Sequence, residues 1–327
     1  MVRVLVTGGA GFIGSHACKA LSLAGHVPIT FDNLVTGWRD AVRFGPFVEG
    51  DLTDRARLDE VFAAYRPDVV LHFAALSNVG EATREPGRYW HNNVLGSMTL
   101  LDAMAAAGVD RIVFSSTCAI YGEQDGVLLT TASPQAPINA YGASKRAVEN
   151  MLRDFGLAHG LRSVSFRYFN VAGADPEGEV GEFHDPETHL IPNTIFAAMG
   201  RKAGLTLHGT DYPTPDGTCV RDYVHVCDLV DAHVLGLDWL MDGGHSTAFN
   251  LGSSRGYSVR EVIAVTEYVT GLPVPVTEGP RRAGDATFLV SGGVRAKELL
   301  GWNPRRSSLD TMIADAYRWH RRNGYSE

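Results

Sequence analysis

A glycine-rich turn near the start of the chain constrains the fold more than any other feature. The apolar run Val4–Val6 is typical of a buried strand, and a stretch with helical apolar spacing begins at Gly14. Glycines at 9, 11 and 14 match the dinucleotide fingerprint, and those at 8, 11 and 14 match a wider form of it. Because glycine has no side chain, such a backbone can approach a pyrophosphate, which the amides and dipole of the helix N-terminus stabilise. The pattern predicts a strand, turn and helix that bind a dinucleotide.

The first half of the chain alternates strand-like and helix-like segments. Continuous apolar runs at 69–71 and 112–114 indicate strands that are covered by helices on both faces. The alternation therefore predicts an α/β fold with a Rossmann-type doubly wound parallel sheet. Strands are predicted at 2–6, 27–32, 46–50, 69–74, 111–116 and 163–169, and helices at 14–24, 56–64, 90–107 and 141–159.

The character of the sequence changes after residue 170. A stretch rich in Gly, Glu and Asp at 174–184 is expected to be a loop, and shorter elements follow it. With 327 residues, we expect a dinucleotide-binding domain at 1–170 and a smaller mixed α/β substrate domain at 171–327, with some segments returning to the first. The later helices are predicted at 191–200, 227–241, 258–270 and 309–322, and strands at 205–209 and 248–251.

An acidic residue at the end of the second predicted strand indicates which dinucleotide binds. The carboxylate of Asp32 is placed to accept hydrogen bonds from the adenosine ribose and would repel a 2′-phosphate, so NAD is favoured over NADP. Asp51 and Leu52 end the third strand and are expected to flank the adenine, although Asp after a strand is often only a turn residue.

Tyr141 and Lys145 stand one turn apart on the same face of a predicted helix. A tyrosine with an ordinary pKa of ~10 is a poor base at neutral pH. The lysine ammonium and an oxidised nicotinamide would favour the phenolate and lower that pKa, and Lys145 can also hold the nicotinamide ribose. Thr117 follows the strand at 111–116 and is expected to hydrogen-bond the reacting oxygen and relay its proton, with Ser116 as the alternative.

Composition excludes several classes of function. The net charge of −8 argues against nucleic acid and anionic membranes as partners. Four scattered cysteines (Cys18, Cys118, Cys219 and Cys227) lack metal-binding spacing, so we expect no metal site and reduced thiols. No signal-like or membrane-spanning apolar run is found, which predicts a soluble cytoplasmic protein.

The three motifs in this order resemble the extended short-chain dehydrogenase/reductase family. Over most of the chain the resemblance narrows to its UDP-glucose (UDP-galactose) 4-epimerases, including rhizobial-type homologues. It implies interconversion of UDP-galactose and UDP-glucose by C4 oxidation, rotation of the 4-keto sugar and re-reduction with tightly bound NAD. The matching stretches are TGGAGFIGSH at 7–16, FDNL at 31–34, EGDL at 49–52, HFAAL at 72–76, NNV at 92–94, YGASK at 141–145, RYFNVAGA at 167–174, DGTCVRDYVHV at 216–226 and PRRAGD at 280–285.

The resemblance also implies two sets of binding residues. Arg221 and Arg282 would clamp the diphosphate and Asp285 would bind the uridine ribose, whereas His225 looks like a packed core histidine. The expected NAD site is Gly8, Gly11, Phe12, Ile13, Gly14, Asp32, Asn33, Asp51, Leu52, Phe73, Ala74, Ala75, Asn93, Ser115, Tyr141, Lys145 and Tyr168. The expected UDP-sugar site is Thr117, Tyr141, Phe169, Asn170, His189, Leu190, Thr206, His208, Arg221, Arg282, Asp285 and Leu289.

Several positions depart from the pattern of these epimerases. Ser77 replaces a common lysine, Thr117 replaces a common serine and keeps its hydroxyl, and His189 replaces a common asparagine at the uridine site. The resemblance also aligns Leu289 with the position that limits pocket size in these enzymes. We expect its branched side chain to leave little room for an N-acetyl group, so that UDP-GlcNAc and UDP-GalNAc are poor substrates.

Alternative functions remain open at this point. A 4,6-dehydratase needs an acid and a base directly after the threonine, but Cys118 and Ala119 stand there. Interconversion of UDP-xylose and UDP-arabinose, or dual specificity, uses the same chemistry at C4, and the segment 187–192 is compatible with it. A non-catalytic NAD-binding protein is a remote alternative, because Tyr141, Lys145 and Thr117 are all kept.

By resemblance we also expect a homodimer that uses the helices at 90–107 and 141–159.

Overall fold

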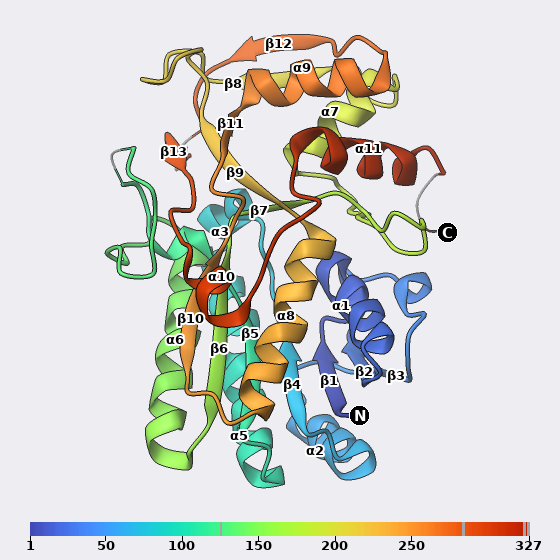
Figure 1. Cartoon of the computed structure of the whole chain (residues 1–327), viewed down its shortest axis with the longest axis vertical. Coiled ribbons are helices and arrows are strands. Elements are labelled where there is room, and N and C mark those ends of the chain that lie inside the picture. The colour runs from blue at the N-terminus through green and yellow to red at the C-terminus, as the bar shows by residue number, and fades with distance from the viewer. Residues whose placement is uncertain (125, 283–284, 323–324, 326–327) are drawn as a thin grey trace.

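The lower part of the molecule in Figure 1 is built around one parallel sheet. The computed structural model describes residues 1–124, 126–282, 285–322 and 325. Seven strands run in the order β10-β6-β5-β4-β1-β2-β3, and each neighbouring pair is parallel, which confirms the predicted doubly wound sheet. These strands are β1 (Arg3–Thr7), β2 (Val27–Asp32), β3 (Phe47–Glu49), β4 (Val69–His72), β5 (Arg111–Thr117), β6 (Arg162–Tyr168) and β10 (Thr247–Leu251).

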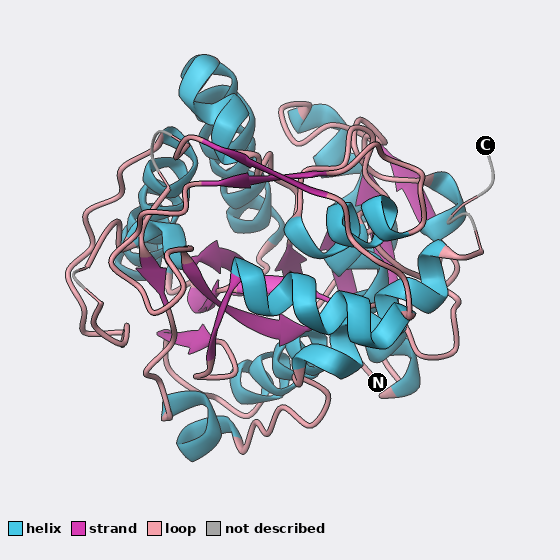
Figure 2. Ribbon diagram, turned by 90° about the horizontal axis from the view of Figure 1, so that it is seen from above, coloured by secondary structure: helices cyan, strands magenta, loops and turns pink. Residues whose placement is uncertain are grey.

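Helices cover both faces of this sheet, as Figure 2 shows from above. Side chains alternate between the faces along β1: Val4 and Val6 join one apolar cluster, and Leu5 joins the cluster on the other side. The first cluster includes side chains of α1 (Phe12–Leu23) and α8 (Val226–Met241). The second includes side chains of α2 (Arg55–Tyr65), α5 (Gly96–Ala107) and α6 (Ala140–His159).

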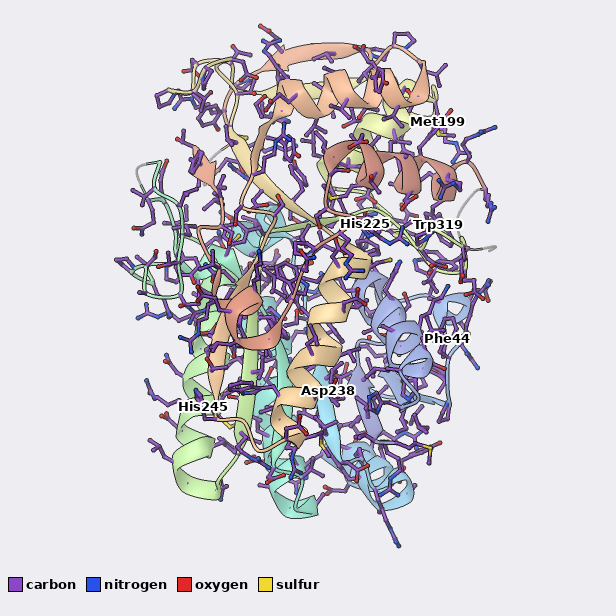
Figure 3. The ribbon with its side chains drawn as sticks, viewed as in Figure 1. Phe44, Met199, His225, Asp238, His245 and Trp319 are labelled. Atoms are coloured by element: carbon purple, nitrogen blue, oxygen red, sulfur yellow. The ribbon has the colours of Figure 1, made fainter. Side chains whose placement is uncertain are left out.

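Two of these elements come from beyond residue 170. Strand β10 pairs with β6, and α8 packs against α1. In Figure 3, His225 lies where the upper and lower parts of the molecule meet, and Asp238 lies toward the far end of α8. His225 is fully buried and its Nδ1 accepts a hydrogen bond from Cys227 N at 3.0 Å, so it caps α8 from a packed position. The domain boundary at residue 170 stays a prediction.

The upper part of the molecule combines short strands with a three-helix layer. The helices α7 (Leu190–Ala198), α9 (Val259–Thr270) and α11 (Leu309–His320) share an apolar cluster. Helix α9 begins with a capping box formed by Ser258 and Glu261. The strands β7 (Asn170–Ala172), β9 (Val220–His225), β11 (Gly256–Ser258) and β13 (Phe288–Leu289) form one small sheet, and β8 (Leu205–His208) pairs with β12 (Val276–Gly279).

The predicted helix at 90–107 consists of two elements, the π-helical turn η2 (Trp90–Leu95) and helix α5. A third element, α4 (Pro86–Tyr89), directly precedes them. Such turns are common at functional sites.

The remaining elements are η1 (Arg39–Ala41), α3 (Val79–Arg84), η3 (Cys118–Ile120) and α10 (Arg295–Leu300). Among all helices of the described residues, none has the length and apolar character needed to cross a bilayer.

Candidate active site

A cavity of about 1070 Å³ opens where the carboxyl ends of the parallel strands meet the upper part of the molecule. Ligands bind at this edge in open α/β sheets. Its wall contains nearly all of the predicted NAD residues: Gly8, Gly11, Phe12, Ile13, Gly14, Asp32, Asn33, Asp51, Leu52, Phe73, Ala74, Ala75, Ser115, Tyr141, Lys145 and Tyr168. It also contains the predicted UDP-sugar residues Thr117, Phe169, Asn170, His189, Leu190, Thr206, His208, Arg221, Arg282, Asp285 and Leu289.

The glycine-rich turn is too crowded for side chains. A Cβ atom on Gly14 would lie 2.1 Å from the Gly8 carbonyl oxygen, and one on Gly8 would lie 2.5 Å from the Ala74 nitrogen. Gly8 also has a φ of +74°, which favours glycine. Gly11 precedes α1 as its N-cap and offers no side-chain hydrogen bond to the first amides, and the first turn of the helix lines the cavity. The turn therefore fits a pyrophosphate.

Asp32 ends β2 beside this turn, and most of its side chain is buried. Oδ2 accepts from Ala10 N at 3.0 Å and Oδ1 accepts from Leu34 N at 2.9 Å. Burial raises the pKa of Asp32 above its ordinary value, although these two amides oppose the shift. Next to it, Asn33 Nδ2 donates to Asp51 Oδ2 at 2.7 Å, which joins two predicted cofactor residues from neighbouring strands. This edge of the cavity can accept hydrogen bonds from a ribose.

Helix α6 brings Tyr141 and Lys145 to the cavity. Its first turn is capped by Asn139, whose Oδ1 accepts from Gly142 N at 2.9 Å. Lys145 Nζ donates to the Ser115 carbonyl oxygen at 2.7 Å, and burial lowers the pKa of Lys145 to about 7. Burial raises the pKa of Tyr141 to about 12, and its hydrogen bond with Thr117 opposes this. The Tyr141–Lys145 spacing predicted a lowered tyrosine pKa, but in the protein alone burial dominates and the pKa is raised.

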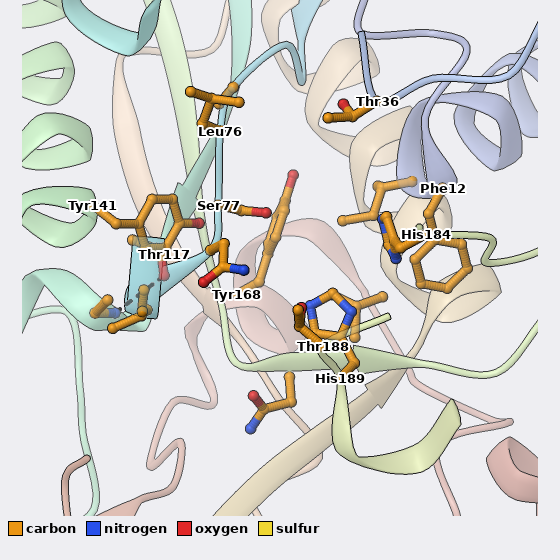
Figure 4. Close-up of a pocket in the computed structure, with 18 of the residues that line it drawn as sticks. Phe12, Thr36, Leu76, Ser77, Thr117, Tyr141, Tyr168, His184, Thr188 and His189 are labelled. Atoms are coloured by element: carbon orange, nitrogen blue, oxygen red, sulfur yellow. Dashed lines mark hydrogen bonds between the residues drawn. The ribbon is translucent and has the colours of Figure 1, made fainter. Parts of the chain in front are cut away.

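Alternation along β5 separates the two candidate hydroxyls. Ser115 and Thr117 line the cavity, whereas Ser116 lies on the opposite face of the strand and its Oγ donates to Glu149 Oε1 at 2.5 Å. Figure 4 shows Thr117 next to Tyr141. Of the two, Thr117 is therefore the hydroxyl beside the tyrosine.

Asn93, which was predicted to contact the cofactor, lies behind the cavity wall. Its Oδ1 accepts from Leu76 N at 2.9 Å, and its Nδ2 donates to the Leu76 carbonyl at 3.0 Å and to Ser144 Oγ at 3.1 Å. Leu76 lines the cavity. Asn93 thus fixes a segment of the wall and joins it to α6.

The upper wall carries the predicted phosphate and sugar residues. Arg221 on β9 pairs in register with Leu289 on β13, and both line the cavity. Asn170 Nδ2 donates to the Asp222 carbonyl at 3.1 Å, which ties β7 to β9. Arg282 and Asp285 also reach the cavity, while the two residues between them in the PRRAGD motif lie outside the described residues.

A cluster of histidines and glutamates in this wall was not predicted from the sequence, apart from His189. His184, Glu187 and His189 line the cavity, and Glu182 lies buried behind them. The nearby carboxylates outweigh the effect of burial and raise the pKa of His184 to about 9 and that of His189 to about 10. The spacing of His and Glu between 182 and 189 is the signal that could have indicated this cluster.

Comparisons with known proteins agree with this site. The model of the NAD dependent epimerase/dehydratase family matches residues 4–252. A UDP-glucose 4-epimerase of Rhizobium meliloti (strain 1021) is 50% identical over 320 residues, which cover 98% of this chain and 97% of that protein.

Two solved structures each align with this chain over 98% of its length and over 98% of their own length. UDP-glucose 4-epimerase from Brucella ovis in complex with NAD is 48% identical with a TM-score of 0.94. The enzyme from Bifidobacterium longum in complex with NAD+ and UDP is 36% identical with a TM-score of 0.93. The chain therefore belongs to the NAD dependent epimerase/dehydratase family.

Proposed function

We propose that this protein is a UDP-glucose 4-epimerase, an isomerase that interconverts UDP-galactose and UDP-glucose with tightly bound NAD. One observation carries the proposal: a single cavity is lined by a catalytic-type set, a dinucleotide turn and arginines. The set is Tyr141, Thr117 and Lys145, which line the wall together with the glycine-rich turn, and the arginines are in the upper wall. The relatives named above support UDP-glucose as the substrate and NAD as the cofactor. They favour the hexose reaction over the pentose reaction and over a non-catalytic protein.

The residues of the cavity fit NAD. The turn at Gly8, Gly11 and Gly14 would hold the pyrophosphate, and Asp32 would accept from the adenosine ribose. Lys145 would hold the nicotinamide ribose from its place beside Ser115. When bound, NAD supplies the acceptor and the donor of the hydride at sugar C4.

Two side chains of this protein would transfer the proton of the sugar 4-hydroxyl. Tyr141 would accept this proton and later return it, while Thr117 holds the tyrosine oxygen and the sugar oxygen together. Because burial raises the pKa of Tyr141 to about 12, the phenolate needs a positive charge beside it. Lys145, one turn along the same helix, would supply that charge in its protonated form, which burial limits by lowering its pKa to about 7.

The diphosphate supplies the binding energy that lets the sugar turn. Arg221 and Arg282 would hold it at the upper wall, and Asp285 would bind the uridine ribose. Interactions remote from the reacting carbon retain the 4-keto sugar while it rotates and presents its other face. The sugar itself then needs only loose contacts.

Quaternary structure and location are part of the proposal. Trp90 and Leu95 of η2 are 43% and 46% exposed beside α5, which supports a homodimer through the predicted helices. The four cysteines are free thiols, which supports a cytoplasmic location.

The test is a product assay with purified protein and no added NAD, offering UDP-galactose and UDP-arabinose in parallel. We expect UDP-galactose to be converted to UDP-glucose, and faster than the pentose is converted. The variant Tyr141→Phe should lower kcat by about 10² to 10⁴ while the protein keeps its bound NAD. An inactive wild type that is folded and carries NAD would contradict the proposal.

A further inference from the structure

Two imidazoles and two carboxylates point into one small space in the cavity wall. They belong to Glu182, His184, Glu187 and His189, and one nitrogen or oxygen atom from each lies within 4.8 Å of the others. His184 Nδ1 is 3.2 Å from Glu182 Oε1 and 3.6 Å from Glu187 Oε2. His189 Nδ1 is 2.6 Å from Glu182 Oε1 and 3.3 Å from Glu187 Oε1.

Three of these converging atoms have ion-pair contacts but make no hydrogen bond of good geometry with the described residues. Glu182 Oε1, His184 Nδ1 and Glu187 Oε2 are buried and have no hydrogen-bond partner within the part of the chain that the structure describes. The Glu182 residue is only 2% exposed. A buried carboxylate is costly unless it is paired with a cation or coordinates a metal ion. A cation at the centre would satisfy nitrogen and oxygen lone pairs together.

A second acidic cluster differs from this one in its cation. Asp175, Glu177 and Glu179 also gather their carboxylates, but Lys19 Nζ lies among them, 2.9 Å from Asp175 Oδ2 and 2.6 Å from Glu179 Oε2. The chain supplies that cluster with its own cation. Within the described chain, the ion pairs of Glu182 are with the two histidines. An imidazole can lose its proton to become a metal ligand, whereas the Lys19 ammonium has no lone pair to offer.

Neighbouring groups hold the ligand-bearing segment in place. Glu187 Oε1 accepts from the backbone amides of Thr188 at 2.7 Å and His189 at 2.8 Å. Trp319 Nε1 donates to the Glu182 carbonyl at 2.8 Å, and Asn193 Nδ2 donates to the His189 carbonyl at 2.8 Å. Support of this kind orients the side chains of metal sites.

We propose that Glu182, His184, Glu187 and His189 bind one divalent transition-metal ion, for which zinc is the best fit. Zinc takes imidazole nitrogen and carboxylate oxygen in tetrahedral sites at about 2.0–2.2 Å, which places ligand atoms about 3.3 Å apart. Among the converging atoms, His184 Nδ1 lies 3.2 Å from Glu182 Oε1 and 3.6 Å from Glu187 Oε2, which matches this spacing. His189 Nδ1 lies closer, 2.6 Å from Glu182 Oε1, so an ion would move these two atoms apart. Imidazole ligands favour a transition metal over magnesium or calcium, which prefer oxygen alone.

The ion fixes the cavity wall and takes no part in proton transfer. His189 directly precedes α7 as its N-cap, and His184 comes from the preceding loop, so one ion ties the loop to the start of the helix. Figure 4 shows both histidines on the side of the cavity away from Tyr141 and Thr117. The cysteine spacing predicted no metal site, whereas this donor set contains no cysteine. The site rests on its own geometry and not on the proposed reaction.

The experiment measures zinc binding to the full chain. Protein freed of metal with a chelator and then dialysed is titrated with zinc chloride alone, and bound zinc is counted by elemental analysis after gel filtration. We expect one zinc ion per chain. His184→Gln and Glu182→Gln should each weaken zinc binding by at least about 100-fold, since each removes a ligand. Glu177→Gln, in the cluster that Lys19 neutralises, is the matched control and should keep one zinc ion.

X-ray absorption at the zinc edge tests the wild type without any substitution. We expect about two imidazole nitrogens and two oxygens at about 2.0–2.2 Å. Three results would each overturn the proposal. The wild type could fail to bind stoichiometric zinc, both ligand variants could bind zinc fully, or the coordination shell of the zinc could consist of sulfur or of oxygen alone. Metal content is counted whether or not the protein turns over UDP-galactose, so the two proposals can fail separately.

Discussion

Leu289 lies beside Arg221 in the parallel pairing of β13 with β9. Both side chains line the cavity, so the residue proposed to bind phosphate and the residue proposed to limit the sugar pocket share one small sheet. A change of volume at Leu289 is therefore expected to act on the substrate close to its proposed phosphate anchor. This relationship makes the sugar specificity testable with one substitution.

Leu289→Cys should admit larger sugars. The smaller side chain leaves room for an N-acetyl group, so we expect kcat/KM for UDP-GlcNAc to rise about tenfold or more, while UDP-galactose turnover changes little. The measurement is the ratio of the two kcat/KM values. Leu299→Cys, at an exposed position on α10, is the control and should leave the ratio unchanged. An unchanged ratio in Leu289→Cys would show that another residue limits the pocket.

Thr117→Val should lower kcat and leave the fold intact. Valine has the shape of threonine without the hydroxyl that bonds Tyr141, so we expect a loss of about 100-fold, and Thr117→Ser should restore most of it. Ser116→Ala is the matched control on the other face of β5. It should keep its activity and lose about 1 kcal/mol of stability, because Ser116 bonds Glu149. Equal losses in Thr117→Val and Ser116→Ala would contradict the assignment.

The parts of the site that could be predicted from the sequence are those carried by short local motifs. The glycine turn follows β1, Asp32 ends β2, and the Tyr141–Lys145 pair lies at the start of α6. Because the carboxyl ends of parallel strands meet at one edge, local motifs on separate strands predict a shared cavity. Alternation along β5 is also local, and it separates Thr117 from Ser116.

The remainder depends on tertiary contacts that no local pattern encodes. Asn93 lies in a π-helical turn and bonds Leu76 and Ser144, so its place relative to the cavity follows from packing. The direction of the Tyr141 pKa shift depends on burial by the assembled cavity. Strands as short as β13 have too few residues to show alternation, which hides the pairing that aligns Leu289 with Arg221.

Gly14→Ala should remove the bound dinucleotide. The added Cβ would lie 2.1 Å from the Gly8 carbonyl oxygen, so the turn must shift and its amides no longer face the pyrophosphate. We expect purified Gly14→Ala protein to carry little NAD, as measured by absorbance and by enzymatic assay after denaturation. Gly87→Ala is the control, because a Cβ there meets open space. Full NAD content in Gly14→Ala would show that the turn tolerates the change.

Lys19→Met should destabilise the protein in a pH-dependent manner. Lys19 Nζ donates to Asp175 Oδ2 at 2.9 Å and ties α1 to the loop that follows β7. Burial alone would raise the pKa of Asp175, but the hydrogen bonds from Lys19 and the Glu179 amide, together with the charge of Lys19, outweigh burial and lower the pKa. A lowered carboxyl pKa stabilises the fold above the ordinary value of about 3.9, and this contribution is lost as the pH falls through the folded-state pKa.

We therefore expect Lys19→Met to lower the free energy of unfolding by about 1–3 kcal/mol at pH 7, because Asp175 loses its buried partner. At pH 3 the difference from the wild type should shrink, since Asp175 is then protonated in more of the molecules. Urea unfolding at both pH values measures this. Arg153→Met removes a pair with Asp154 whose side chains are 65% and 63% exposed, and should change stability by less than about 0.5 kcal/mol. A Lys19→Met deficit of equal size at both pH values would show that lost packing of the lysine stem, and not its charge, accounts for the effect.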